Sequence, residues 1–66
     1  MNIVLNGDQK KVAVGTSISQ LLDTYKIVPE TIIVQLNGML VQLDVIGDEG
    51  LSEGDQLEFI RFVGGG

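Results

Sequence analysis

Cysteine and histidine are both absent from this chain of 66 residues. Without them, side chains cannot supply a thiol nucleophile, an imidazole base or the usual tetrahedral zinc site. The Ser, Thr and Tyr hydroxyls have no imidazole to activate them, so we expect neither an enzyme nor a bound cofactor or metal. The absence of disulfides in so small a domain fits the reducing environment of the cytoplasm.

Positive charge is also scarce. Four Lys and Arg stand against nine Asp and Glu, which gives a net charge of −5. An acidic domain lacks the basic footprint that binds a phosphate backbone, so nucleic acid is not expected as a partner. The negative charge fits either a basic protein partner or solubility alone. The N-terminus has no basic segment followed by an apolar run, and no apolar run approaches membrane-spanning length, so we expect no signal peptide and no membrane partner.

What remains is a short, apolar chain with one unusual end. Its length predicts one domain, which we place at residues 1–63, followed by a flexible glycine tail at residues 64–66. A domain this small buries only about 60% of the surface that its unfolded chain exposes. We therefore expect a thin core and no deep substrate cavity.

The N-terminal half predicts a β-hairpin followed by a helix. Alternation indicates a strand over residues 2–6, a turn at Gly7-Asp8, and a second strand that ends at Gly15. Ser17 and Gln20 fit the capping box of a helix of about ten residues. The second strand is expected to place Lys10, Val12 and Val14 on one face, and the helix to bury Ile18, Leu21, Leu22 and Tyr25, with Pro29 helping to end it.

The C-terminal half predicts three more strands. A β-branched segment at residues 32–36 runs into Asn37-Gly38, a strong signal for a tight hairpin turn, and residues 39–43 return. An acidic loop at residues 44–54 carries Leu51 as its expected core anchor, and the last strand covers residues 56–63. The order β-β-α-β-β-β predicts an α+β domain with one helix packed across a mixed sheet.

Carboxylates gather in sequence around the acidic loop, which raises the possibility of a site for a hard cation. The loop lacks the ligand spacing of an EF-hand, so we interpret it as a solvated acidic surface. Asp8 and Asp55 are interpreted as turn formers, because Asp side chains bond to nearby backbone. The acidic residues concerned are Asp44, Asp48, Glu49, Glu53 and Asp55.

The tail Gly64-Gly65-Gly66 cannot pack side chains and does nothing for the fold. It makes a narrow thread that reaches about 10 Å beyond the last strand and can enter a tunnel closed to side chains. Its end is the carboxylate of Gly66, which becomes reactive once activated, for example as an acyl-adenylate. A linker or a frayed terminus is the alternative interpretation.

The last strand adds an apolar surface beside this thread. If Leu57 and Phe59 face the core, alternation places Glu58, Ile60 and Phe62 outward, and it places Val4 outward on the first strand. An exposed apolar stripe next to a reactive end is typical of a docking site. A register shifted by one residue would instead turn the stripe inward.

These features together resemble the ThiS family, the ubiquitin-like β-grasp sulfur carriers of thiamine biosynthesis. The resemblance spans the chain and is carried by the element order, the Asn37-Gly38 turn, the Gly54-Asp55 pair before the last strand, and the ending Phe62-Val63-Gly64-Gly65-Gly66. By position, Gly66 matches the modified residue, Gly65 and Gly64 complete the tail, and Ile60, Phe62 and Val63 match the partner-facing end of the strand.

The resemblance implies a carrier that other enzymes act upon. An adenylyltransferase similar to ThiF would use ATP to adenylate Gly66, and sulfur from a donor protein would convert the adenylate to a thiocarboxylate. A thiazole synthase similar to ThiG would then take the sulfur to build the thiazole ring of thiamine.

Three alternatives remain open from the residues. The small subunit of molybdopterin synthase resembles this fold and ends in Gly-Gly, although those chains tend to be longer and to carry proline or alanine before the diglycine. A modifier conjugated to lysines of other proteins would share the activation step. A plain interaction module with a frayed tail would have no activation step at all.

Overall fold

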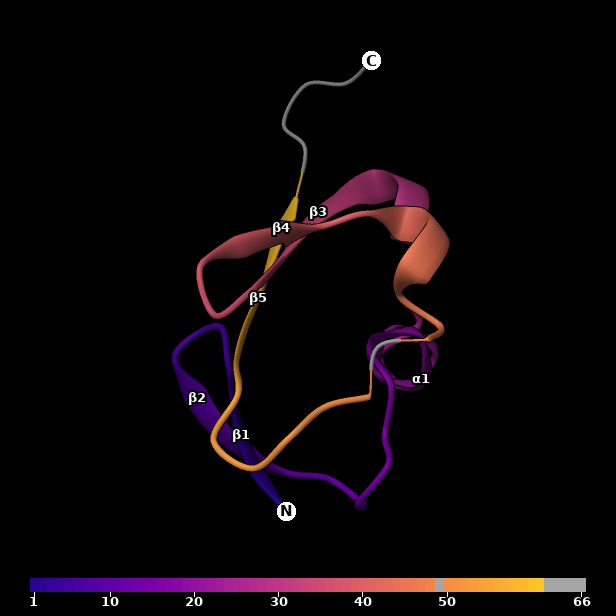
Figure 1. Cartoon of the computed structure of the whole chain (residues 1–66). Coiled ribbons are helices and arrows are strands. Elements are labelled where there is room, and N and C mark those ends of the chain that lie inside the picture. Colours follow the sequence, from indigo (N-terminus) through magenta and orange to yellow (C-terminus); the bar gives the residue numbers. More distant parts are fainter. Residues whose placement is uncertain (49, 62–66) are drawn as a thin grey trace.

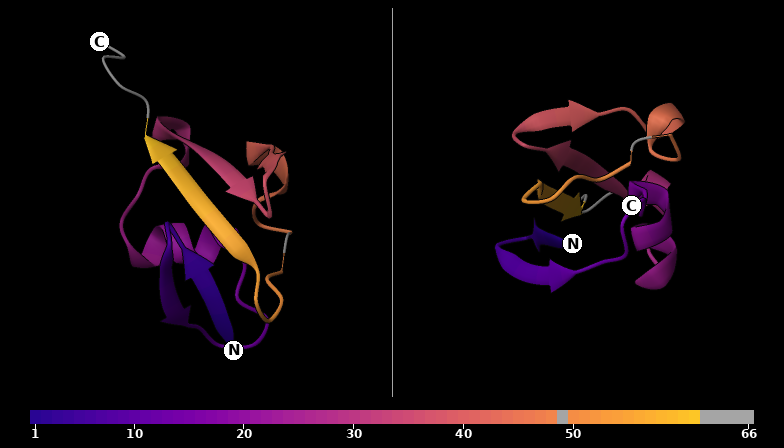
Figure 2. Two further views of the ribbon diagram at one scale, coloured as in Figure 1. Left: turned by 90° about the vertical axis from the view of Figure 1, so that its left-hand side faces the viewer. Right: turned by 60° about the horizontal axis from the view of Figure 1, so that its bottom comes forward.

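The computed structural model describes residues 1–48 and 50–61, which form a mixed five-stranded sheet with one α-helix on one face (Figures 1 and 2). The sheet order is β2-β1-β5-β3-β4, with β1 and β5 parallel and the other neighbours antiparallel. This confirms the predicted α+β architecture. The elements are β1 Asn2–Leu5, β2 Asp8–Lys11, α1 Ile18–Thr24, β3 Ile32–Leu36, β4 Met39–Val41 and β5 Gln56–Arg61, with 3₁₀ turns at Pro29–Thr31 and Leu43–Val45.

The first hairpin differs from the prediction in its turn and in its second strand. Leu5 lies opposite Asp8, so the two turn residues are Asn6 and Gly7, with φ values of 50° and 85°. Positive φ at both positions matches the right-handed twist of the flanking strands, and Asn-Gly is the sequence that tolerates it. Asp8 therefore begins β2 and does not form the turn as predicted.

The second strand is also shorter than predicted, because β2 ends at Lys11. Val12 is half-buried and packs against the core, whereas Val14 is 87% exposed. The prediction that both valines continue the strand was wrong. Val12 and Val14 belong to a loop that packs only partly against the core, so their apolar character does not indicate a strand.

Both Asn-Gly turns are bonded to β5. The backbone N–H of Asn6 donates to Leu57 O (2.9 Å), and its Oδ1 accepts from the N–H of Phe59 (2.9 Å). Asn37 does the same on the other side, donating to Gln56 O (2.7 Å) and accepting from the N–H of Gln56 through Oδ1 (2.9 Å). The predicted turn at Asn37-Gly38 is confirmed, with φ values of 52° and 83°. The two hairpins thus hold β5 between them.

The helix begins as predicted and ends earlier. Ser17 Oγ accepts from the N–H of Gln20 (3.1 Å), and Gln20 Oε1 accepts from the N–H of Ser17 (2.9 Å), which completes the capping box. At the other end, Lys26 has φ 56°, and the N–H of Ile27 donates to Leu22 O (2.8 Å). This is a Schellman ending, with lysine in the left-handed position that glycine usually occupies.

Because the helix ends early, Tyr25 is also more exposed than predicted. The helix has seven residues instead of about ten, and Tyr25 is its C-cap. Tyr25 was predicted to be buried with the helical stripe but is 43% exposed. The chain turns away at Lys26, three residues before Pro29, so the proline does not set the end of the helix.

The core lies between α1 and the inner face of the sheet. Leu51 anchors the acidic loop in it, as predicted, and Ile46 provides a second anchor from the same loop. β4 is shorter than the predicted strand at residues 39–43, because a 3₁₀ turn begins at Leu43. Among the described residues, the buried apolar side chains are Ile3, Leu5, Ile18, Leu21, Leu22, Ile32, Val34, Ile46, Leu51 and Leu57.

In residues 1–48 and 50–61, no helix is long and apolar enough to cross a membrane. The predicted boundary between residues 63 and 64, and the predicted continuation of the last strand to residue 63, lie outside the described residues.

Candidate functional site

β5 is the last strand that the structure describes before the C-terminal residues. β5 lies between β1 and β3, and its final residue, Arg61, lies at the end of the sheet away from the N-terminus (Figure 2). Hydrogen-bonded neighbours on both sides give this strand a fixed direction. The predicted site residues Phe62, Val63 and Gly64–Gly66 lie outside the described residues, so their roles stay predictions.

The alternation along β5 is as predicted. Leu57 is buried and Phe59 is half-buried against the core, whereas Glu58 is exposed and Ile60 is 40% exposed. The alternative register, shifted by one residue, is therefore wrong. Glu58 and Ile60 face away from the helix, on the outer face of the sheet.

Val4 lies on the same outer face, further than Ile60 from the end of β5. It is half-buried and lines a shallow groove with Gln35, Gln56 and Glu58, between the two Asn-Gly turns. Val4 and Ile60 are therefore on one face but at different distances from the end of β5. The predicted orientation of both residues is confirmed, and their contact with a partner stays a prediction.

The structure adds two apolar residues that the sequence analysis missed. Ile33 on β3 lies directly opposite Ile60, and Leu40 on β4 lies opposite Gln35, which itself faces Glu58. Leu40 is 61% exposed, and both Ile33 and Leu40 line a groove at the outer edge of the sheet. We call Ile33, Leu40 and Ile60 the outer-face patch. Alternation in β3 could have placed Ile33 outward, but only the strand order shows that it neighbours Ile60.

The acidic residues near β5 shape the turn that leads into it. Asp55 accepts from the N–H of Ser52 (2.8 Å) and from Asn37 Nδ2 (3.1 Å), which confirms its predicted role as a turn former. Glu53 Oε1 accepts from the N–H of Asn2 (2.9 Å). Among the residues that the structure describes, no three His, Cys, Asp or Glu side chains are grouped so that they could hold a metal ion.

Comparison with known proteins agrees with this arrangement. Two structures of a thiamine biosynthesis protein from Geobacter metallireducens resemble the whole chain. The crystal structure, of the protein named ThiS, is 32% identical and has a TM-score of 0.85, with all of both chains covered. The solution structure is 30% identical with a TM-score of 0.78, covering all of this chain and 88% of the other.

Another relative is much longer. A thiazole synthase from Magnetococcus marinus is 36% identical over 66 residues, which is all of this chain and 20% of that protein. The chain therefore spans about one fifth of the length of this relative. The model of the ThiS family matches residues 3–66, a range that includes β5 and all three terminal glycines. On this match and on the β-grasp fold, the chain belongs to the ThiS family.

Proposed function

We propose that this protein is a sulfur carrier of thiamine biosynthesis and that the carboxylate of Gly66 carries the sulfur. The observation that supports this most is the family match through residue 66, on a chain with the fold of a thiamine biosynthesis protein. The position of β5 supports it further, because β3 pairs with β5 from Leu57 to Arg61 and so holds this strand up to its last described residue. The same comparisons favour thiamine over molybdopterin biosynthesis.

The chemistry that we propose takes place at the end of the thread. A carboxylate is a poor acyl donor because its oxygen is a poor leaving group. An adenylyltransferase would let the Gly66 carboxylate attack the α-phosphorus of ATP, releasing pyrophosphate and leaving an acyl-adenylate. The terminal sulfur of a persulfide on a donor protein would then displace AMP to leave an acyl disulfide. A second thiol would attack the donor's sulfur, which releases the thiocarboxylate and leaves a disulfide between the donor and that thiol. ATP belongs to the partner, and the carrier itself is a co-substrate.

We further propose that a thiazole synthase receives the sulfur. The relative from Magnetococcus marinus is named a thiazole synthase and contains a segment that resembles this entire chain. A carrier joined to its acceptor in one polypeptide has a high effective concentration at the acceptor site. That arrangement supports a direct encounter between this protein and a thiazole synthase.

A mass measurement tests the proposal. The protein is incubated with ATP, a sulfur source and its adenylyltransferase, and its intact mass is then determined. We expect a gain equal to the exchange of one oxygen for sulfur, localised to Gly66 by fragmentation. If an enzyme that is active on another carrier produces no such gain, the sulfur-carrier proposal is wrong. A modifier would instead become attached to lysines of other proteins.

The outer-face patch gives a second prediction. Because Ile60 is partly exposed beside the tail, we expect Ile60→Ser to lower kcat/KM for adenylation about tenfold, through lost apolar contact with the adenylyltransferase. We expect it to lower the free energy of unfolding by less than about 1 kcal/mol. Pyrophosphate release with the carrier as the varied substrate measures the first quantity, and urea denaturation the second.

The matched control is Val14→Ser, which removes an exposed β-branched side chain from the loop between β2 and α1, outside the sheet. It should leave kcat/KM unchanged. Equal rates for both variants would mean that the outer-face patch does not contact the adenylyltransferase.

A further inference from the structure

The helix leaves one end of the inner face uncovered. Phe59 lies opposite Val34 and Arg61 opposite Ile32, so both side chains are on the helix side of the sheet. Because α1 ends at Thr24, it does not reach this end, and a hollow remains beside the last residues of β5. We call it the inner hollow; its apolar lining is Leu5, Tyr25, Ile27, Ile32 and Phe59, and Arg61 stands at its rim.

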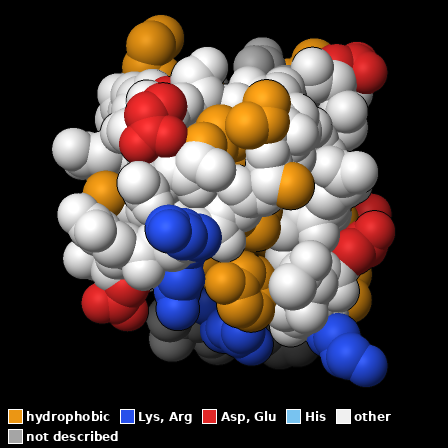
Figure 3. All heavy atoms as spheres, turned by 90° about the horizontal axis from the view of Figure 1, so that it is seen from below, with side chains coloured by type: hydrophobic (Ala, Val, Ile, Leu, Met, Phe, Trp, Pro, Cys, Tyr) orange, Lys and Arg blue, Asp and Glu red, His pale blue; other side chains and the backbone are white. Residues whose placement is uncertain are grey.

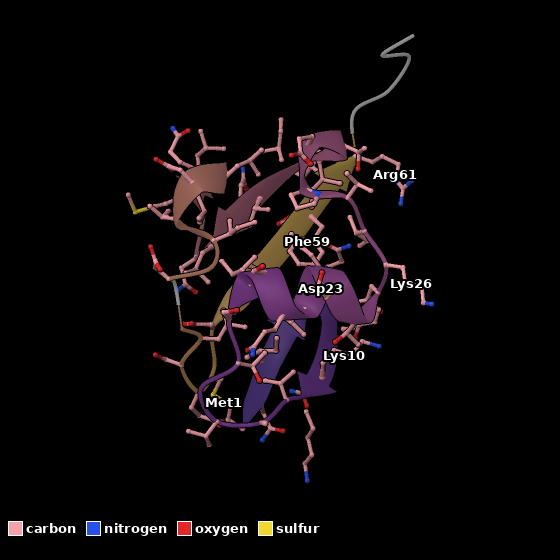
Figure 4. The ribbon with its side chains drawn as sticks, turned by 90° about the vertical axis from the view of Figure 1, so that its right-hand side faces the viewer. Met1, Lys10, Asp23, Lys26, Phe59 and Arg61 are labelled. Atoms are coloured by element: carbon pink, nitrogen blue, oxygen red, sulfur yellow. The ribbon has the colours of Figure 1, made fainter. Side chains whose placement is uncertain are left out.

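Arg61 is the charged residue in the lining of the hollow, and two lysines lie on the same side of the sheet. Lys26 sits between Tyr25 and Ile27, which both line it, and Lys10 lies opposite the buried Ile3, hence on the same side of the sheet. With Arg61, three of the four cations of the chain border one side of the molecule. Figure 4 shows Lys10, Lys26 and Arg61 along that side. In the view of Figure 3, basic side chains appear in two separate places toward the lower part of the surface, while acidic ones are scattered around it.

Two carboxylates on the same side of the molecule partly offset the positive charge of these three side chains. Asp8 lies opposite Leu5 at the start of β2, on the same side of the sheet as Lys10. Asp23 lies on α1, on the side seen in Figure 4. The local balance is still positive, on a chain whose net charge is −5. This contrast distinguishes the inner hollow from the rest of the surface.

We propose that the inner hollow is a docking site for an acidic protein segment that inserts one aliphatic side chain. An apolar floor with cations on the same side of the molecule is complementary to a leucine or isoleucine flanked by Asp and Glu. Hydrophobic burial would supply affinity, and the charges would supply orientation and a faster encounter. The lysines on that side can also extend their apolar stems toward the inserted side chain.

The position of the hollow gives this docking site a role that rests on the proposed carrier function. It lies on the opposite face of the sheet from the outer-face patch, so one partner can bind each face at the same time. Arg61 borders it, and the segment that leads to Gly66 begins at the next residue. A partner bound here would hold the base of the thread while the outer face stays free.

The test uses the isolated protein and a defined probe. The blocked peptide EDLDE is titrated into ¹⁵N,¹³C-labelled protein, with QNLNQ as the uncharged peptide. We expect chemical-shift changes concentrated at Tyr25, Ile27, Phe59 and Arg61 for EDLDE, and at least about tenfold weaker binding for QNLNQ. Raising the salt concentration to about 0.5 M should weaken the binding of EDLDE in the same way.

Three variants make the assignment specific. The double variant Lys10→Glu/Lys26→Glu should weaken the binding of EDLDE about tenfold or more, whereas Asp8→Asn should strengthen it about twofold. Lys11→Glu is the matched control, because Lys11 lies opposite Asn2 and faces the other side of β2; it should change the affinity by less than about twofold. Amide spectra verify that each variant is folded.

Shifts scattered over the surface, equal binding of both peptides, or equal weakening by Lys11→Glu and by the double variant would each overturn the proposal. So would a lack of any shift at millimolar peptide. None of these results bears on sulfur loading, which the mass of Gly66 reports separately.

Discussion

Removing Gly66 is expected to lower the rate of sulfur loading by about a hundredfold or more while leaving the folded domain unchanged. The deletion still ends in a glycine carboxylate, but it draws that group back by about 3.5 Å. A displacement of even 1 Å from the reacting geometry can cost about a hundredfold in rate. The rate of the oxygen-to-sulfur mass gain, measured with the adenylyltransferase, ATP and a sulfur source, tests the expectation.

A second variant of the C-terminus separates the effect of a shorter tail from the effect of a missing carboxylate. A semisynthetic protein with a carboxamide at Gly66 keeps the full length and lacks the acid, so it should not be loaded at all. If the carboxamide is loaded, the terminus is not the working group. If the deletion variant is loaded at the original rate, the adenylyltransferase does not depend on the length of the glycine tail. Thermal unfolding of both variants should match the parent, because every core residue in the described part of the chain precedes Arg61 and the changes are confined to Gly66.

Leu57→Ala is expected to unfold most of the protein at 25 °C. Leu57 is 1% exposed and lies opposite Leu5 on β1 and Leu36 on β3, at the centre of the sheet. Truncating a buried leucine costs about 2–5 kcal/mol, through lost transfer free energy and the cavity left behind. A single core in a domain of this size rarely provides more than about 3–5 kcal/mol of net stability. Urea denaturation followed by far-ultraviolet circular dichroism measures the loss.

Two control variants test whether the expected loss of stability comes from the cavity at a buried site. Leu57→Met nearly conserves side-chain volume and should cost less than about 1.5 kcal/mol. Leu40→Ala removes a leucine that is mostly exposed, and we expect a change within about 0.5 kcal/mol. A loss below about 1 kcal/mol for Leu57→Ala would contradict a core centred on β5.

Much of the fold could be predicted because its signals are local. The capping box at Ser17, the Asn37-Gly38 turn and the alternation of Leu57 with Glu58 each depend on neighbouring residues in the chain. The errors came where local signals compete. The turn predicted at Gly7-Asp8 lies at Asn6-Gly7, because Asn-Gly suits positive φ at both positions. The helix predicted to have about ten residues is shorter, because Lys26, which carries no glycine signal, forms a Schellman ending before Pro29 can contribute.

The sequence by itself determined the order of the elements, the absence of thiol and imidazole chemistry, and the glycine ending that makes Gly66 the candidate working group. Only the tertiary structure decided which residues are neighbours across strands. The placement of β5 between β1 and β3 brings Ile33 beside Ile60. The short helix leaves Phe59 and Arg61 at an open hollow, with Lys10 and Lys26 on the same side of the molecule. These contacts join residues far apart in the chain, and alternation assigns a side chain to a face without saying which strand lies next to it.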